Sequence, residues 1–152
     1  QPRLGSAIVI ILDTHIWLWW IGRRTEKLKT RWTKEIKQAD RVCVSSISLF
    51  EIAWPSEKNR ISLPTSAQVW LEKALIPSGV GLIPISPEIA YRAVSLEYHH
   101  SDPQDRLIIS TAVVLNSRII SADEKFKKSR RRNDDCGAVD ERKLYEVYNV
   151  GS

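Results

Sequence analysis

Four acidic residues stand near the points where one secondary-structure element is expected to give way to the next: Asp13, Glu51, Asp105 and Asp123. Asp13 and Asp123 each follow an apolar run, while Glu51 and Asp105 lie near the starts of helical patterns. In an open α/β sheet, the carboxyl ends of the strands and the starts of the following helices form a common crevice. We therefore expect the four carboxylates to converge in space although they are dispersed along the chain.

Converging carboxylates repel one another unless a cation neutralises them. Oxygen ligands of this kind select a hard ion, Mg²⁺ or Mn²⁺, rather than zinc. Such an ion activates a bound water and stabilises negative charge on a phosphate, so the cluster predicts metal-dependent phosphodiester hydrolysis.

Each acid also has a purely structural explanation. Asp13 and Asp123 could cap the helices that follow them. Glu51 follows Ser48 at the spacing of a capping box. At the third position of its helix, the charge of Asp105 would complement the helix dipole.

The segment that opens at Asp102 separates the two explanations at one site. Asp102 precedes Pro103, so it is the natural N-cap, with proline at the first helical position. Asp105 is then not needed as a cap. We assign Asp102 to structure and Asp105 to chemistry.

The elements that position these acids alternate along the chain. The apolar, β-branched run 7–12 is typical of a strand buried on both faces of a parallel sheet. The alternation predicts an α/β fold, a three-layer α/β/α arrangement with a mostly parallel central sheet. The expected strands cover 7–12, 41–45, 81–85 and 118–122, with a last edge strand over 144–150; the expected helices cover 14–21, 26–39, 46–54 (ended by Pro55), 65–75, 87–96 and 103–115, with a short helix from Glu124.

Length and charge narrow the class of protein. The chain has 152 residues, which favours one domain, here expected over 7–150, with 1–6 and 151–152 as remnants of cloning. The net charge of +5 suits a polyanionic partner such as nucleic acid. Two cysteines, Cys43 and Cys136, without metal-ligand spacing indicate a reduced, cytoplasmic protein. The longest apolar run is too short to cross a membrane, so no membrane contact is expected.

Around the acids, the sequence resembles the PIN-domain ribonucleases, and its order and length resemble most the VapC toxins of toxin–antitoxin modules. The resemblance covers about residues 7 to 126 and lies in four blocks, Leu12–His15, Ser46–Ala53, Asp102–Leu107 and Ile120–Asp123. It implies a Mg²⁺-dependent endoribonuclease that cuts structured RNA such as tRNA or rRNA. It also implies a homodimer and a small cognate antitoxin whose tail occupies the active-site groove.

By position, the four acids of this chain match the acidic residues of that family, and Ser121 falls where the family often has a small hydroxyl residue near the metal. Two features depart from the pattern. Pro55 stands where the family's helix usually continues, and the tail 129–150 is longer and more charged than expected.

Basic residues offer candidate RNA contacts. Lys127, Lys128 and Arg130–Arg132 form a run that either contacts the RNA backbone or is a solvated loop. Arg106, beside Asp105, is either an ion-pair partner of the acid cluster, which we prefer, or a phosphate contact. His99 and His100 are adjacent, so they do not share a helix face, and we do not expect a histidine metal site.

Three tryptophans, Trp17, Trp19 and Trp20, lie close together in the first helix. Core packing explains one or two of them, and an exposed remainder would mark a dimer or antitoxin surface.

Two alternative functions remain open on the sequence. A non-catalytic module that binds RNA or protein could use the same fold. A receiver-like domain, with Asp13 as the phosphate acceptor, would need a lysine beyond a late strand, where this chain has Asp123.

Overall fold

The computed structural model describes residues 7–96 and 102–123. Several sequence predictions lie outside these residues: the short helix from Glu124, the basic run Lys127, Lys128 and Arg130–Arg132, the edge strand 144–150, His99, His100 and Cys136. Among the helices within the described ranges, none is long and apolar enough to cross a membrane.

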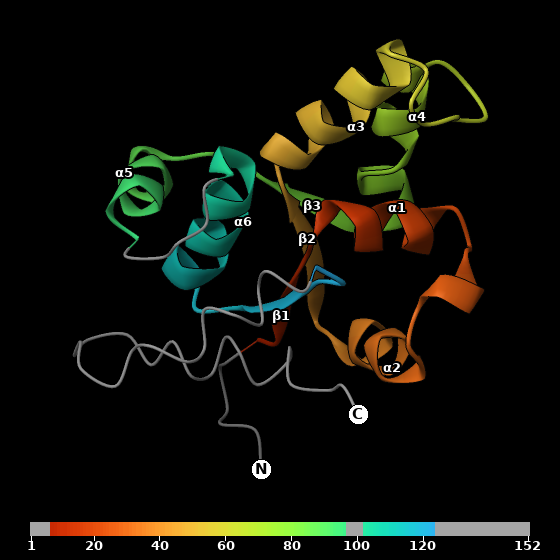
Figure 1. The fold of residues 1–152 in the computed structure, drawn as a ribbon. Coiled ribbons are helices and arrows are strands. Elements are labelled where there is room, and N and C mark those ends of the chain that lie inside the picture. Colours follow the sequence, from red (N-terminus) through yellow and green to blue (C-terminus); the bar gives the residue numbers. More distant parts are fainter. Residues whose placement is uncertain (1–6, 97–101, 124–152) are drawn as a thin grey trace.

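Four parallel strands form the sheet of the described residues (Figure 1): β1 (Val9–Leu12), β2 (Arg41–Ser45), β3 (Val80–Ile83) and β4 (Arg118–Ile120). Their order is β3-β2-β1-β4, and every neighbouring pair is parallel. Because β1 and β4 are paired with Leu12 opposite Ile120, the residues that follow these two strands emerge side by side. The prediction of a parallel sheet is confirmed.

Successive side chains of each strand point to opposite faces of the sheet. Leu12 and Val44 enter one buried cluster, whereas their neighbours Ile11 and Cys43 enter the other. Both clusters are shielded from water, which explains why β1 is apolar throughout rather than alternating.

Helices cover both faces and complete the predicted three layers (Figure 1). On one side lie α1 (Thr14–Ile21), α2 (Thr30–Gln38) and α4 (Ala67–Lys73). On the other, α6 (Pro103–Val114) packs against the sheet and α5 (Pro87–Ser95) packs against α6.

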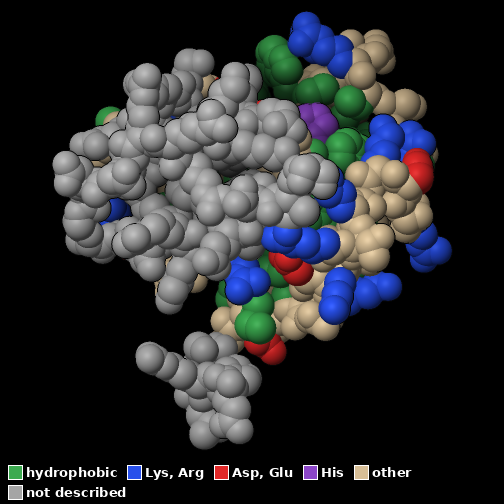
Figure 2. All heavy atoms as spheres, turned by 60° about the horizontal axis from the view of Figure 1, so that its bottom comes forward, with side chains coloured by type: hydrophobic (Ala, Val, Ile, Leu, Met, Phe, Trp, Pro, Cys, Tyr) green, Lys and Arg blue, Asp and Glu red, His purple; other side chains and the backbone are tan. Residues whose placement is uncertain are grey.

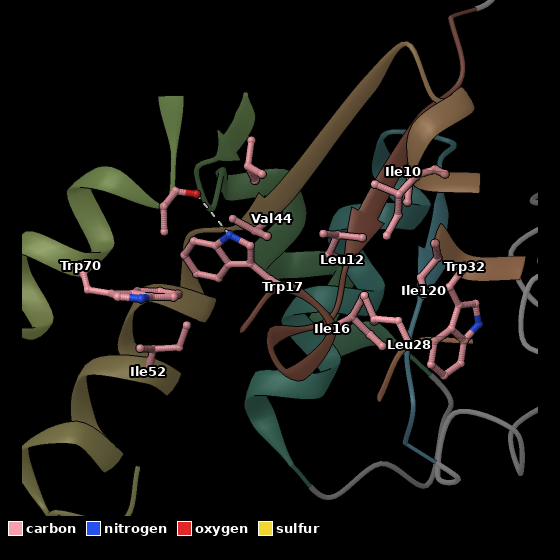
Figure 3. Close-up of a cluster of buried hydrophobic side chains, with 13 residues drawn as sticks. Ile10, Leu12, Ile16, Trp17, Leu28, Trp32, Val44, Ile52, Trp70 and Ile120 are labelled. Carbon is pink, nitrogen blue, oxygen red and sulfur yellow. Dashed lines mark hydrogen bonds between the residues drawn. The ribbon is translucent and has the colours of Figure 1, made fainter. Parts of the chain in front are cut away.

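Trp17 forms the centre of the core on the α1 side (Figure 3). Its side chain is fully buried, its ring lies 5.6 Å from that of Trp70, and its indole N–H donates to the carbonyl of Ala74 over 3.2 Å. The hydrogen bond satisfies the one polar atom that burial would otherwise leave unpaired. Trp19 and Trp20 are only partly buried. One or two of the three tryptophans were expected from the sequence to pack in the core, and Trp17 does so.

The prediction of one helix over 26–39 is wrong. A short 3₁₀ helix, η1 (Thr25–Lys27), is separated from α2 by Leu28 and Lys29, both of which have extended backbone. The extended backbone at Leu28 lets its side chain reach the core, where it is 8% exposed. Burial of an apolar side chain has therefore overridden a continuous helical pattern.

The prediction that Pro55 ends its helix is also wrong. Helix α3 (Ile47–Glu57) contains Pro55 in its last turn. Proline removes one helical hydrogen bond. The N–H of Lys58 nevertheless donates to the carbonyl of Trp54 over 3.2 Å, so helical bonding resumes after the proline. The other helices begin and end within two residues of their predicted boundaries. The largest difference is at α4 (Ala67–Lys73), which was predicted over 65–75.

Candidate active site

Asp13 joins the end of β1 to the start of α1 and has two roles. One oxygen, Oδ1, accepts the N–H of Thr14 over 2.8 Å and caps the helix. The other, Oδ2, accepts the hydroxyl of Ser121 over 2.6 Å. Ser121 follows the neighbouring strand β4, so this hydrogen bond ties the first acid to the segment that carries the fourth. The capping explanation for Asp13 is correct but accounts for only one of its oxygens.

Ser121 also organises Asp123. Its hydroxyl oxygen accepts the backbone N–H of Asp123 over 3.0 Å while its proton goes to Asp13. One hydroxyl therefore fixes the spacing between these two acidic segments at the carboxyl end of the sheet.

Glu51 is held by a hydroxyl of α1, and its interpretation as a capping-box residue is wrong. Its Oε1 accepts the hydroxyl of Thr14 over 2.8 Å. Since the one proton of Thr14 is used in this bond, Ser48, whose hydroxyl oxygen lies 2.8 Å from that of Thr14, acts as the donor to Thr14. The N-cap position of α3 is Ser46, whose hydroxyl accepts the N–H of Ile85 instead of capping its own helix.

The prediction that Asp102 rather than Asp105 caps α6 is confirmed, and the chemical role of Asp105 stays a prediction. Asp102 is the N-cap, and its Oδ1 accepts the N–H of Gln104 over 2.9 Å. Asp105 lies in the first turn and is 8% exposed. Burial first, and then the negative charges of Asp102, Asp13, Asp123 and Glu51 in that order, together raise the pKa of Asp105 to about 7. The described fold therefore brings the other three predicted acids within electrostatic range of Asp105.

The other two shifted carboxyls follow the same physics. Burial raises the pKa of Glu51 to about 6, opposed by the hydroxyl of Thr14 and assisted by the charge of Asp13. Burial also raises the pKa of Asp13, although the Ser121 hydroxyl and the Thr14 N–H both favour its charged form. A set of acids that holds protons this strongly is a set that a cation would stabilise.

The candidate ligands are all carboxylate oxygens, and their negative charges repel one another. Both properties fit a hard divalent cation. Within residues 7–96 and 102–123, however, no three acidic, histidine or cysteine side chains lie close enough together to hold an ion in their present positions. Asp13 and Glu51 each accept a hydrogen bond there, from the hydroxyls of Ser121 and Thr14 respectively.

Arg106 has a role that the sequence analysis did not consider. Its guanidinium donates to the main-chain carbonyls of Ala93 over 2.8 Å and Leu96 over 2.6 Å, at the end of α5. Carbonyls at a helix end lack partners within the helix, and a cation satisfies them well. These contacts fix the start of α6, where Asp105 lies, against α5. Ion pairing with the acids and phosphate contact, the two roles predicted for Arg106, stay predictions.

Thr14 and Ser48 are the residues of this site that the sequence analysis missed. Their signal was present, since Thr14 follows Asp13 directly and Ser48 stands three residues before Glu51. The spacing of three residues between Ser48 and Glu51 occurs in a capping box, and it also occurs where a hydroxyl supports an acid on the next turn of a helix. Only the fold distinguishes these two arrangements.

The PIN domain family matches residues 10–131 of the chain. Ribonuclease VapC22 of Mycobacterium tuberculosis is 33% identical over 122 residues, which cover 80% of this chain and 92% of that protein. This chain is a PIN domain of the VapC type. The resemblance inferred from the four acidic blocks is confirmed.

Solved structures share the fold of this VapC-type domain. The structure described as VapBC2 from Rickettsia felis bound to promoter DNA aligns with a TM-score of 0.55 and 19% identity, over 80% of this chain and 92% of that one. A toxin–antitoxin complex from Klebsiella pneumoniae aligns with a TM-score of 0.52 and 22% identity, over 79% and 88%.

Asp102→Ala tests the division of roles at the start of α6. We expect a loss of stability of about 0.5–2 kcal/mol, because an N-cap is removed. RNA cleavage at a temperature where the VapC-type domain stays folded should remain close to that of the original protein. Urea unfolding and a cleavage assay on the same preparation measure the two effects. A folded but inactive variant would show that the chemistry had been assigned to the wrong aspartate.

Proposed function

We propose that this chain is a Mg²⁺-dependent endoribonuclease, with Mn²⁺ able to replace Mg²⁺, that acts as the toxin of a toxin–antitoxin pair. The observation that carries the proposal is the group of four carboxylates at the carboxyl end of the sheet, where burial and then the neighbouring negative charges raise the pKa of Asp105 to about 7. The VapC22 relative, described as a ribonuclease, supports the same activity.

Within this proposal, Asp13, Asp105 and Asp123 are the main metal ligands, and Glu51 is either a fourth ligand or the group that orients the attacking water. The metal, when bound, lowers the pKa of that water and offsets the charge of the scissile phosphate. The chain's own hydroxyls set the geometry: Ser121 holds Asp13, and Thr14 holds Glu51. Such supporting hydrogen bonds orient metal ligands and tune their basicity.

The proposed partners are a structured RNA substrate such as tRNA or rRNA, a small cognate antitoxin and a second copy of this chain. Of the two solved structures named above, the one from Rickettsia felis is described as VapBC2 and the one from Klebsiella pneumoniae as a toxin–antitoxin complex.

Incubation of the purified protein with a pool of total tRNA and rRNA tests the activity. We expect discrete cut products with Mg²⁺ and none with EDTA, and Asp105→Asn serves as the control for a contaminating nuclease. Binding of RNA that survives EDTA, with no products under any metal, would instead support the alternative of a non-catalytic RNA-binding module.

The basic run gives a separate prediction for the proposed RNA contact. Replacing Arg130, Arg131 and Arg132 with Ser should weaken RNA binding without changing the cleavage site, because phosphate contacts position a strand but read no sequence. Each lost contact should lower the salt dependence of binding by about 0.7 in the log–log slope on single-stranded RNA. Filter binding across a salt series measures both effects. Unchanged affinity and slope would show that Lys127, Lys128 and the three arginines form only a solvated segment.

A further inference from the structure

One side of α1 carries a row of ring and cationic side chains that leads away from the acid cluster. His15 is exposed in the first turn of the helix, and its ring centroid lies 6.1 Å from that of Trp19. The ammonium of Lys27, from η1, lies 5.4 Å from the centroid of the Trp19 ring. Because a helix rises about 1.5 Å per residue, Trp19 lies about 9 Å along α1 from Asp13. The row therefore begins beside the proposed reaction centre.

The row continues into the most basic segment of the described chain. Residues 23–37 contain seven Lys and Arg against two Glu. One of these acids, Glu35, is neutralised by Arg31 at 3.0 Å, and Lys34 and Lys37 are exposed on α2. The described part of the face shown in Figure 2 carries many lysine and arginine side chains and few acidic ones. A cationic surface with an aromatic ring at its edge is typical of single-stranded nucleic-acid binding.

We propose that the RNA strand next to the scissile phosphate follows this side of α1, with a base against Trp19 and phosphates at Lys27 and at the cations of α2. The proposal rests on the proposed ribonuclease function and adds a direction for the strand. Lys27 is exposed, so its ammonium can leave the indole ring for a phosphate, which exposes the ring to a base.

Helix α3 offers the natural comparison, because it carries a pair of the same chemistry. The ammonium of Lys58 lies 5.2 Å from the centroid of the Trp54 ring, and Trp54 stands one turn beyond Glu51. Lys27 and Lys58 each follow a glutamate, Glu26 and Glu57. The α1 row, however, leads into a segment with seven Lys and Arg against two Glu, whereas residues 54–60 carry two cations against one Glu. A phosphate backbone is therefore favoured along α1 over α3.

The experiment measures RNA affinity in EDTA, so that no strand is cut, using an unstructured oligoribonucleotide and a tRNA. Trp19→Leu/Lys27→Gln is compared with Trp54→Leu/Lys58→Gln, which removes the same ring and the same charge. We expect the first double variant to bind the oligoribonucleotide at least about tenfold more weakly, with a salt slope lower by about 0.7. The second should bind as the original protein does. Lys27→Gln alone, which leaves the partly buried Trp19 in place, should reproduce the change in slope without a change in thermal unfolding.

Equal affinities for the original protein and Trp19→Leu/Lys27→Gln, or a loss only in the Trp54→Leu/Lys58→Gln variant, would overturn the path along α1. If the original protein cuts RNA with Mg²⁺ in the same series, the proposed function survives that result. If the original protein neither binds nor cuts RNA, both proposals are wrong.

Discussion

Asp105→Asn is expected to lower RNA cleavage by at least about a hundredfold and to leave the fold intact. Loss of a residue that only supports a metal ligand typically costs about 10–100-fold, so loss of a direct ligand should cost more. Asp105 is buried beside like charges, and burial first and these charges second raise its pKa to about 7. The neutral amide relieves that repulsion, so the free energy of unfolding without metal should hold or rise. Cleavage rates at limiting Mg²⁺, with urea unfolding of the same samples, measure both effects.

Asp102→Asn is the matched control for that substitution. It removes the same charge from the same helix start, and asparagine caps a helix about as well as aspartate. We therefore expect it to remain active and stable. Asp13→Asn should be as inactive as Asp105→Asn. It differs from Asp105→Asn in its hydrogen bonds, because the two carboxylate oxygens of Asp13 accept from Thr14 and Ser121 and an amide has only one oxygen to accept with. Cleavage at the original rate by either Asp13→Asn or Asp105→Asn would contradict the metal assignment.

Without metal, stability is expected to fall as the pH rises through the range in which Glu51 and Asp105 ionise. Both carboxyls have folded-state pKa values above their unfolded values, at about 6 and about 7. The folded state thus binds more protons, and the free energy of unfolding decreases between about pH 4 and about pH 7. Each pKa unit corresponds to about 1.4 kcal/mol at most, less where solvent screens the group.

Mg²⁺ should reverse this trend, because it binds the ionised carboxylates and not the protonated ones. The stabilisation by Mg²⁺ should therefore be large at about pH 8 and small at about pH 5. Urea unfolding at both pH values, with Mg²⁺ or with EDTA, gives the four free energies required. Asp105→Asn should show a smaller pH dependence and a smaller Mg²⁺ effect than the original protein. A pH dependence that is the same in both proteins would show that Asp105 does not titrate in this range.

Local patterns were sufficient for several features of this domain. The β-branched run before Asp13 predicted a strand buried on both faces, and its two buried clusters confirm that. Asp102 could be identified as a cap because Pro103 fixes its own φ and keeps the preceding residue, Asp102, out of the helical region. These features depend on residues adjacent in sequence, so their physics is contained in a short window.

Other features depended on which surfaces meet in three dimensions. Leu28 interrupts a helical pattern because the core accepts its side chain, and no window around it contains that core. The strand order β3-β2-β1-β4 places Ser121 beside Asp13, and the packing of α1 against α3 places the Thr14 hydroxyl on Glu51. Acid type and spacing along the chain thus determined which residues could perform the chemistry. Only the packing of the elements decided which oxygen bonds which hydroxyl, because hydrogen bonds of about 3 Å form between residues that are remote in sequence only after the fold has brought them together.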